Sequence, residues 1–256
     1  AGVNATVGAA IELSGGITVP NQISANMQNA NSQNGLYSGF GRGSITSVSG
    51  VNTITGPISA ANDYGLGAAA GATLNVAGGI SVVGTGRVMS LLGDGDINFT
   101  TTPLTGIYAV FKLGGGTSTI SVPTAALTNA AGIRNFGGGG VLALAGSGSI
   151  GASANNLVTL TGGGIFRLDN SAVAISNRVG GLGNLLMSDG RLDLVASSTA
   201  AVTETFGTIT SNWGGGEIRV TTTDQPATIV GSSLSIASSG GASILFRAVN
   251  AGSTFG

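Results

Sequence analysis

The stretch Gly164-Ile-Phe-Arg-Leu168 places two apolar residues at alternate positions after a glycine, and this five-residue pattern recurs through the second half of the chain. It returns at Gly140-Val-Leu-Ala-Leu144, Gly190-Arg-Leu-Asp-Leu194 and Gly216-Glu-Ile-Arg-Val220, and at Ala242-Ser-Ile-Leu-Phe246 with alanine in place of glycine. Successive copies begin about 24 to 26 residues apart, a separation typical of structural repeats. Because alternating apolar residues are typical of a strand with one buried face, each copy predicts a short β-strand.

Apolar pairs extend the pattern toward the N-terminus, where the leading glycine is less regular. Three further pairs precede Leu142/Leu144, namely Ile120/Val122, Ile97/Phe99 and Leu74/Val76. Each pair lies about 22 to 23 residues before the next. A second series runs just upstream of the first, with Ile209 less well registered within it, through Val158/Leu160, Leu185/Met187 and Leu234/Ile236. The segment Ile11–Val19 also matches Leu74–Val82, at an offset close to three repeats.

A repeat of about 22 to 26 residues with glycine-rich corners predicts an all-β fold, a parallel β-solenoid in which each coil holds two or three short strands. Propeller blades have longer repeats of about 40 residues, and β-sandwiches have no fixed period, so both fit less well. The pattern predicts one continuous solenoid segment over residues 1–256, with about ten or eleven coils and essentially no helix. The start at Ala1 and the end at Gly256 suggest a fragment of a longer repetitive protein.

The composition narrows the classes of function. The 256 residues include 9 Lys or Arg, 10 Asp or Glu, 47 Gly and neither His nor Cys, so the usual general base, metal ligands and thiol nucleophile are missing. A net charge of −1 argues against nucleic-acid binding, which needs a basic surface. No apolar run is long enough for a transmembrane helix. We therefore expect no enzyme activity and no cofactor.

Four segments of the sequence resemble the autotransporter-associated β-strand repeat proteins of bacterial surfaces. The segments are Ser49-Gly-Val-Asn-Thr-Ile-Thr-Gly-Pro-Ile58, Ala70-Gly-Ala-Thr-Leu-Asn-Val-Ala-Gly-Gly-Ile80, Phe166-Arg-Leu-Asp-Asn170 and Thr203-Glu-Thr-Phe-Gly-Thr-Ile209. The resemblance implies an exported, β-helical passenger with a structural or adhesive role in an extracellular or cell-surface location. The expected partners are further copies of the chain, joined end to end or laterally, and cell-surface glycans.

The acidic residues offer the only candidates for a catalytic or metal site. A glycosidase needs two facing carboxylates, and the local pairs are Asp94 with Asp96 and Asp189 with Asp193. The Gly93-Asp-Gly-Asp96 turn also resembles a calcium-binding β-roll turn, but that mechanism needs the motif in tandem and it occurs once. The favoured interpretation is a solvated corner, so no catalytic, cofactor-binding or metal-binding residue is assigned.

Charged residues of both signs occupy the outward positions of the repeated strands. The alternation places three arginines and three acids there, namely Arg167, Arg191 and Arg219 with Asp169, Asp193 and Glu217. The favoured interpretation is ion pairing between coils on one exterior face, and the alternative is a strip that binds anionic glycans.

These observations together predict a structural surface rod, such as a stalk, a fibre or an adhesin passenger. The end of a solenoid exposes unpaired strands, so the most specific version of this prediction is that the rods assemble into filaments or a sheath. The alternative is a β-helix that binds or cleaves carbohydrate.

Overall fold

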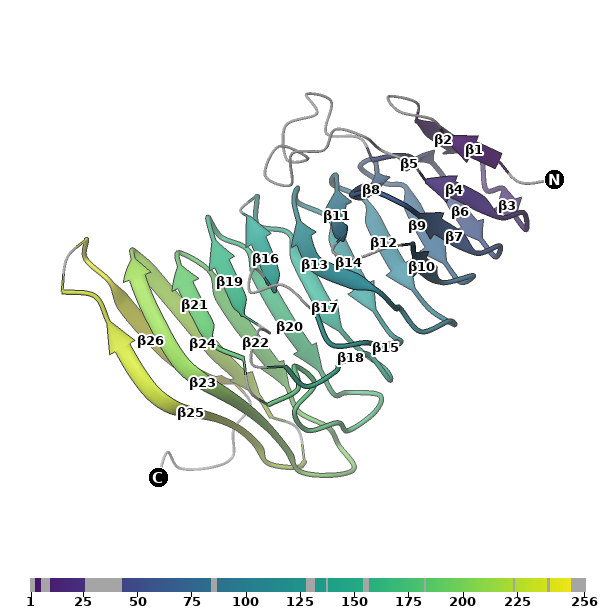
Figure 1. The fold of residues 1–256 in the computed structure, drawn as a ribbon. Coiled ribbons are helices and arrows are strands. Elements are labelled where there is room, and N and C mark those ends of the chain that lie inside the picture. The colour runs from purple at the N-terminus through teal and green to yellow at the C-terminus, as the bar shows by residue number, and fades with distance from the viewer. Residues whose placement is uncertain are drawn as a thin grey trace.

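The chain folds as an all-β solenoid of parallel strands in a computed structural model (Figure 1). The structure describes residues 3–5, 10–25, 43–83, 87–127, 132–136, 138–153, 157–181, 183–222, 224–238 and 240–249. These ranges contain strands, turns and bends but no helix, and hence no helix long and apolar enough to cross a membrane. The predicted fold class is confirmed.

Two long parallel sheets run along the solenoid, and the chain contributes to both of them in every coil. Sheet I contains β2 (Ile11–Ser14), β5 (Ile45–Ser49), β8 (Tyr64–Ala68), β11 (Arg87–Leu92), β13 (Ile107–Lys112), β16 (Ile133–Phe136), β19 (Val158–Thr161), β21 (Leu185–Ser188), β23 (Val202–Trp213) and β25 (Ala227–Ile236). Sheet II contains β3 (Thr18–Val19), β6 (Val51–Ile54), β9 (Thr73–Val76), β12 (Asp96–Phe99), β14 (Thr117–Ile120), β17 (Val141–Leu144), β20 (Ile165–Asp169), β22 (Arg191–Val195), β24 (Gly215–Thr221) and β26 (Ser243–Val249). Each coil therefore adds one strand to each long sheet.

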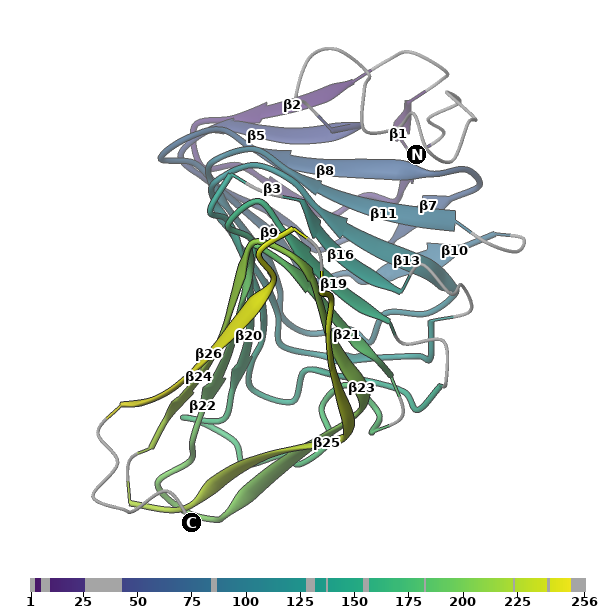
Figure 2. The ribbon, with the colours of Figure 1, turned by 90° about the vertical axis from the view of Figure 1, so that its left-hand side faces the viewer.

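The two long sheets form a wedge, joined along one edge by short turns, and β25 and β26 can be seen diverging from such a turn in Figure 2. A third side closes the wedge over the first coils with β1 (Val3–Ala5), β4 (Ile23–Ala25), β7 (Ile58–Ala60) and β10 (Ile80–Val82), and over later coils with β15 (Pro123–Thr124) and β18 (Ser149–Ile150). Figure 2 also shows that the C-terminal strands are rotated relative to the N-terminal strands, which is the accumulated twist expected of stacked strands.

The core lies between the sheets and runs along the stack as columns of inward-facing residues. In sheet II one column passes through Leu142, Phe166, Leu192 and Ile218, each paired in register with the next and each at most 2% exposed. Because every side chain in the column packs on the coils above and below, the core is continuous along the rod.

The repeated glycine permits the close approach of neighbouring coils. A Cβ atom at Gly140 would collide with the carbonyl oxygen of Gly114, and one at Gly116 would collide with that of Gly95. The glycine that opens the repeat is thus required by the contact between coils at the corner.

The register predicted from the sequence is wrong at two coils. Ile120 pairs with Leu144 and with Phe99, so Ser118 and Ile120 occupy the positions that the pattern gave to Ile120 and Val122. The pattern missed this register because Ser118 is polar yet buried. At the last coil Phe246 pairs with Ile218, two residues away from the predicted register, because the preceding turn is longer than those of earlier coils.

The match between the N-terminal segment and residues 74–82 also proves misleading. Ile11 belongs to β2 of sheet I, whereas Leu74 belongs to β9 of sheet II. The residue in register with Val76 is Val19, through Ile54. Strands on every side of the wedge alternate apolar and polar residues in the same way. Two segments with similar sequences can therefore lie on different sides of a coil, as Ile11 and Leu74 do.

Candidate functional site

The most highly charged part of the described surface lies on the outer face of sheet II, where β20, β22 and β24 are neighbours. Arg167, Asp193 and Arg219 occupy one outward column, paired in register across the three strands, and Arg191 lies two residues before Asp193. The local sequence explains the placement, because these residues alternate with inward-facing apolar residues along each strand.

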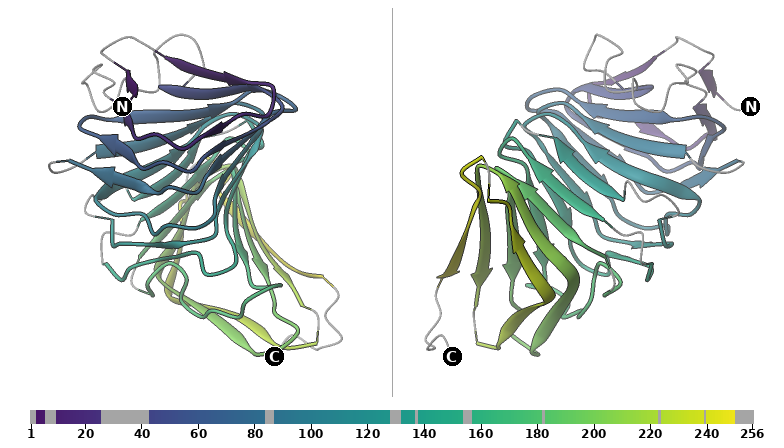
Figure 3. Two further views of the ribbon diagram at one scale, coloured as in Figure 1. Left: turned by 90° about the vertical axis from the view of Figure 1, so that its right-hand side faces the viewer. Right: turned by 60° about the vertical axis from the view of Figure 1, so that its left-hand side comes forward.

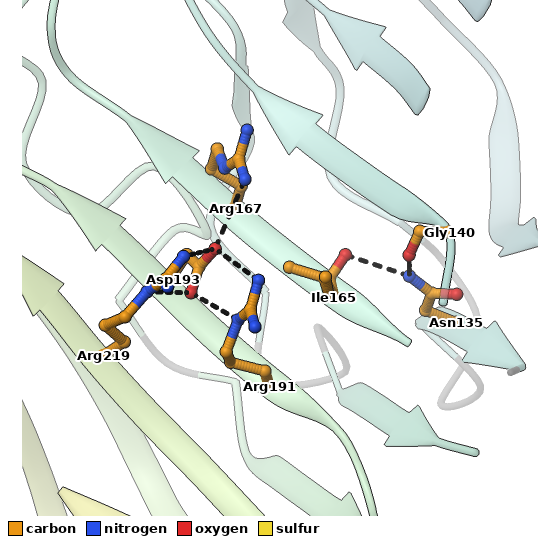
Figure 4. Close-up of polar contacts among 7 residues, drawn as sticks. All are labelled: Asn135, Gly140, Ile165, Arg167, Arg191, Asp193 and Arg219. Carbon is orange, nitrogen blue, oxygen red and sulfur yellow. Dashed lines mark hydrogen bonds and ion pairs between the residues drawn. The ribbon is translucent and has the colours of Figure 1, made fainter. Parts of the chain in front are cut away.

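Asp193 lies at the centre of this group and contacts all three guanidinium groups (Figure 4). Arg219 binds it in a two-point fork, with Nε 3.1 Å from Oδ1 and Nη2 2.9 Å from Oδ2. Arg191 approaches the same oxygens, with Nε 2.8 Å from Oδ1 and Nη2 3.3 Å from Oδ2. Arg167 makes one longer contact, from Nη2 to Oδ2 at 3.4 Å. We call these four residues the arginine cluster.

The geometry shows the predicted ion pairing between coils, with an uneven balance of charge. The Asp193 side chain is 3% exposed, whereas those of the three arginines are 26% to 34% exposed. One buried carboxylate therefore holds three partly exposed cations, and the cluster has a formal charge of +2.

The two other acids of this face are bound elsewhere. Glu217 forms an ion pair with Arg247, in which Nε of Arg247 lies 3.0 Å from Oε1 of Glu217. Asp169 Oδ1 accepts a hydrogen bond of 2.9 Å from the backbone N–H of Ser171. The sequence predicted that the acids would offset the arginines, but Asp193 is the acid whose contacts with the cluster arginines the structure records.

The acidic pair in the glycine-rich turn supports the backbone of the next coil. Asp94 Oδ1 accepts a hydrogen bond of 2.7 Å from the N–H of Gly115, and Asp96 Oδ1 accepts one of 3.3 Å from the N–H of Thr117. Both contacts join consecutive coils across a corner. This arrangement fits the corner interpretation of the Gly-Asp-Gly-Asp sequence.

The second acidic pair is divided between two structural roles. Asp189 stands in the turn before β22 with a positive φ of 63°, a conformation that Asp tolerates better than most residues, while Asp193 belongs to the arginine cluster. Within the described ranges, no group of three or more His, Cys, Asp or Glu side chains is arranged to hold a metal ion.

Two polar residues lie in a core column of sheet I, where sequence reasoning did not place them. Lys112 pairs in register with Leu91 and Asn135, and both polar side chains are buried. Lys112 Nζ donates to the carbonyl oxygens of Leu113 at 3.1 Å and Gly114 at 2.9 Å. Burial lowers the pKa of Lys112 to about 8, although the charges of Asp94 and Asp96 act in the opposite direction.

Asn135 supports the corner that follows its strand. Its Nδ2 donates to the carbonyl oxygens of Gly140 and of Ile165 in the next coil, each at 2.9 Å (Figure 4). Asn52 has the same role near the N-terminus, because its Oδ1 accepts from the N–H groups of Gly16 and Ile17 at 3.1 and 3.0 Å. These asparagines satisfy turn backbone that would otherwise be buried without partners.

A buried arginine connects several coils in the C-terminal half. The Arg178 side chain is fully buried and donates to the carbonyl oxygens of Gly146, Gly148 and Val173 and to Oδ1 of Asn170. Its backbone N–H donates to Oε1 of Glu204, 2.8 Å away in β23. No periodic signal marks Arg178, so the sequence pattern could not identify it.

Glu204 is expected to make stability depend on pH. Burial raises its pKa to about 7, while hydrogen bonds from the N–H groups of Arg178 and Val179 and the Arg178 charge act in the opposite direction. Because this value lies above the ordinary value of 4.5, the folded state binds the proton more tightly. The contribution of Glu204 is therefore fully present below about pH 4.5 and is lost as the pH rises through about 7.

Denaturant unfolding at pH 5 and pH 7.5 tests this expectation. The denaturant concentration at the unfolding midpoint should be lower at pH 7.5 than at pH 5 in the unmodified chain. The difference should be smaller in Glu204→Gln, which retains an oxygen for the Arg178 N–H. An undiminished pH dependence in Glu204→Gln would show that another group is responsible.

Comparison of the chain with protein-family models, with curated proteins and with solved structures finds no match in any of the three.

Proposed function

We propose that the chain is a non-catalytic, structural β-solenoid of an extracellular or cell-surface protein, serving as a stalk, a fibre or an adhesin passenger. The continuous core and the strand pairing along both long sheets support an elongated rod that could serve as a spacer. The scarcity of catalytic side chains in the composition supports a non-catalytic role. The surface location is supported by the resemblance of the repeats to bacterial passenger proteins.

One observation carries the more specific proposal of end-to-end assembly, namely the exposed edge formed by β25 and β26 (Figure 3). Among the residues that the structure describes, these are the outermost strands at one end of the two long sheets. Their apolar residues Leu234, Ile236 and Phe246 are 54%, 48% and 54% exposed, whereas their column neighbours within the stack are buried. Each of the two strands pairs with a described strand on one side only, and such an edge with exposed core residues favours addition of another β-strand layer.

We propose that a second copy of the chain supplies this layer. Its outermost strands β2 and β3 lie at the opposite ends of the same two sheets. All strand pairs within both sheets are parallel, so head-to-tail stacking of β2 on β25 and of β3 on β26 continues both sheets in the same sense. Such a heterologous contact does not close on itself and therefore builds a filament.

Charge placed on this edge is expected to abolish assembly. The double variant Leu234→Lys, Phe246→Lys should retain the fold, because both side chains are already about half exposed, but lysine opposes pairing at a strand edge. Light scattering coupled to size-exclusion chromatography, with electron microscopy, should show concentration-dependent oligomers for the unmodified chain and monomers for the variant.

The matched control is Val173→Lys, which alters an apolar residue that is 44% exposed in the segment after β20, several coils from either end of the stack. It should assemble like the unmodified chain. A monomeric unmodified chain at all concentrations, or equal loss of assembly in Val173→Lys, would contradict the proposal.

A β-helix that cleaves carbohydrate remains the alternative class. Cleavage would require facing carboxylates, whereas Asp94 and Asp96 accept hydrogen bonds from backbone N–H groups and Asp193 is enclosed by arginines. The arginine cluster favours binding over cleavage.

A further inference from the structure

We propose that the arginine cluster is a binding site for the sulfate or carboxylate groups of an anionic polysaccharide. The inference is independent of end-to-end assembly, because the cluster lies on the outer face of sheet II and not at the edge of the stack. It rests on the charge, the fixed geometry and the exposure of the cluster.

The outer face around the cluster keeps an excess of positive charge. Asp193 offsets one of the three guanidinium charges of the cluster. Glu217 is in register with Arg191 but pairs with Arg247, and Asp169 Oδ1 accepts a hydrogen bond from the N–H of Ser171. Counting Arg247, the arginines of this face exceed its acids by one charge. The excess of positive charge is therefore concentrated over three neighbouring strands. Guanidinium groups bind oxyanions through paired N–H donors, which makes arginine well suited to sulfate and carboxylate groups.

The buried carboxylate also fixes the arginines before any ligand arrives. Arg219 and Arg191 each approach both Asp193 oxygens, which limits the rotation of their long side chains. A ligand then loses less affinity to the ordering of side chains than it would on a mobile lysine patch. Asp193 acts here as a positioning residue, and the exposed parts of the guanidinium groups meet the ligand.

The strand register gives the cluster a linear form that suits a polymer. Arg167 and Arg219 lie two strands apart in one outward column, a distance of roughly 9.6 Å at the ordinary interstrand spacing. Arg191 lies between them in the adjacent outward column. A chain that carries repeated acidic groups can contact several guanidinium groups at once, and such contacts reinforce one another.

The test measures binding of immobilised dextran sulfate, polygalacturonate and neutral dextran by biolayer interferometry. The unmodified chain should bind one or both polyanions, more weakly as salt increases, and should not bind neutral dextran. Binding to dextran sulfate alone would identify sulfate as the ligand group, and binding to both would identify oxyanions in general. Equal response to neutral dextran and to both polyanions would overturn the proposal.

Arg167 is the most informative position for substitution, because its single contact of 3.4 Å contributes least to holding Asp193. Arg167→Gln should weaken polyanion binding by about tenfold, the scale of a hydrogen bond to a charged group, while Arg167→Lys should retain part of the affinity. The melting temperatures of both variants should match that of the unmodified chain.

The matched control is Arg134→Gln, which removes one positive charge from β16 of sheet I. It should change polyanion affinity less than twofold. If Arg134→Gln weakened binding as much as Arg167→Gln, the attraction would be a general effect of net charge and the assigned site would be wrong.

Discussion

Replacing Arg178 with alanine is expected to lower the free energy of unfolding by about 3 to 5 kcal/mol, the scale seen when one member of a buried charged network is removed. The guanidinium donates to the carbonyl oxygens of Gly146 at 3.0 Å and Val173 at 2.7 Å, and its Nε donates to Asn170 Oδ1 at 2.8 Å. Alanine leaves these buried acceptors without their donor and opens a void between coils. Guanidinium chloride unfolding followed by circular dichroism measures the effect.

Arg247→Ala serves as the control for this change. Arg247 also forms an ion pair, with Glu217 at 3.0 Å, but its side chain is 56% exposed. Exposed pairs contribute little, so a loss of less than about 1 kcal/mol is expected. A stability of Arg178→Ala indistinguishable from that of Arg247→Ala would refute the role assigned to the buried arginine.

Truncation of Phe166 should lower the free energy of unfolding by a similar amount, but for a different physical reason. The side chain is fully buried in the central column of sheet II, in register with Leu142 and Leu192 on the neighbouring coils. Phe166→Ala removes the ring from a core that is packed on both sides, and such a change costs about 3 to 5 kcal/mol. Denaturant unfolding again provides the measurement.

Phe246→Ala offers a matched comparison, because it is the same substitution in the same column at the open end. Phe246 is in register with Ile218 and is 54% exposed, so its truncation in the monomer should cost less than about 1 kcal/mol. Losses of equal size at the two positions would contradict the placement of Phe246 at an uncovered edge.

The fold class could be predicted from the sequence because the apolar alternation repeats with the length of the coil. The prediction located the strands around Phe166, Leu192 and Ile218, where both inward positions are apolar. It slipped in register at Ser118, because a hydrophobic pattern cannot recognise a buried polar residue. Lys112 was missed as a core residue for the same reason, and its partners are the backbone carbonyls of the next two residues, a group that every residue carries and that leaves no signal in the sequence.

The candidate site was predictable in part. The outward positions of Arg167, Asp193 and Arg219 follow from strand alternation and from their equal spacing along the chain, one coil apart in each case. The excess of positive charge could not be predicted from the sequence, because the sequence does not show that Glu217 forms its ion pair with Arg247. Arg178 gave no signal because its carbonyl partners lie up to 32 residues away and carry no side-chain information.

The parallel stacking of coils also determines how the rod carries force. The chain winds around the axis, while the hydrogen bonds between coils lie along it, so tension on the rod pulls directly on the contacts between neighbouring coils. A coil that detaches from the open edge exposes the next coil to the same load. Each step releases about 22 to 26 residues, on the order of 80 Å of extended chain. Under tension we therefore expect the solenoid to unfold one coil at a time, with each detached coil adding its extended length before the next coil detaches.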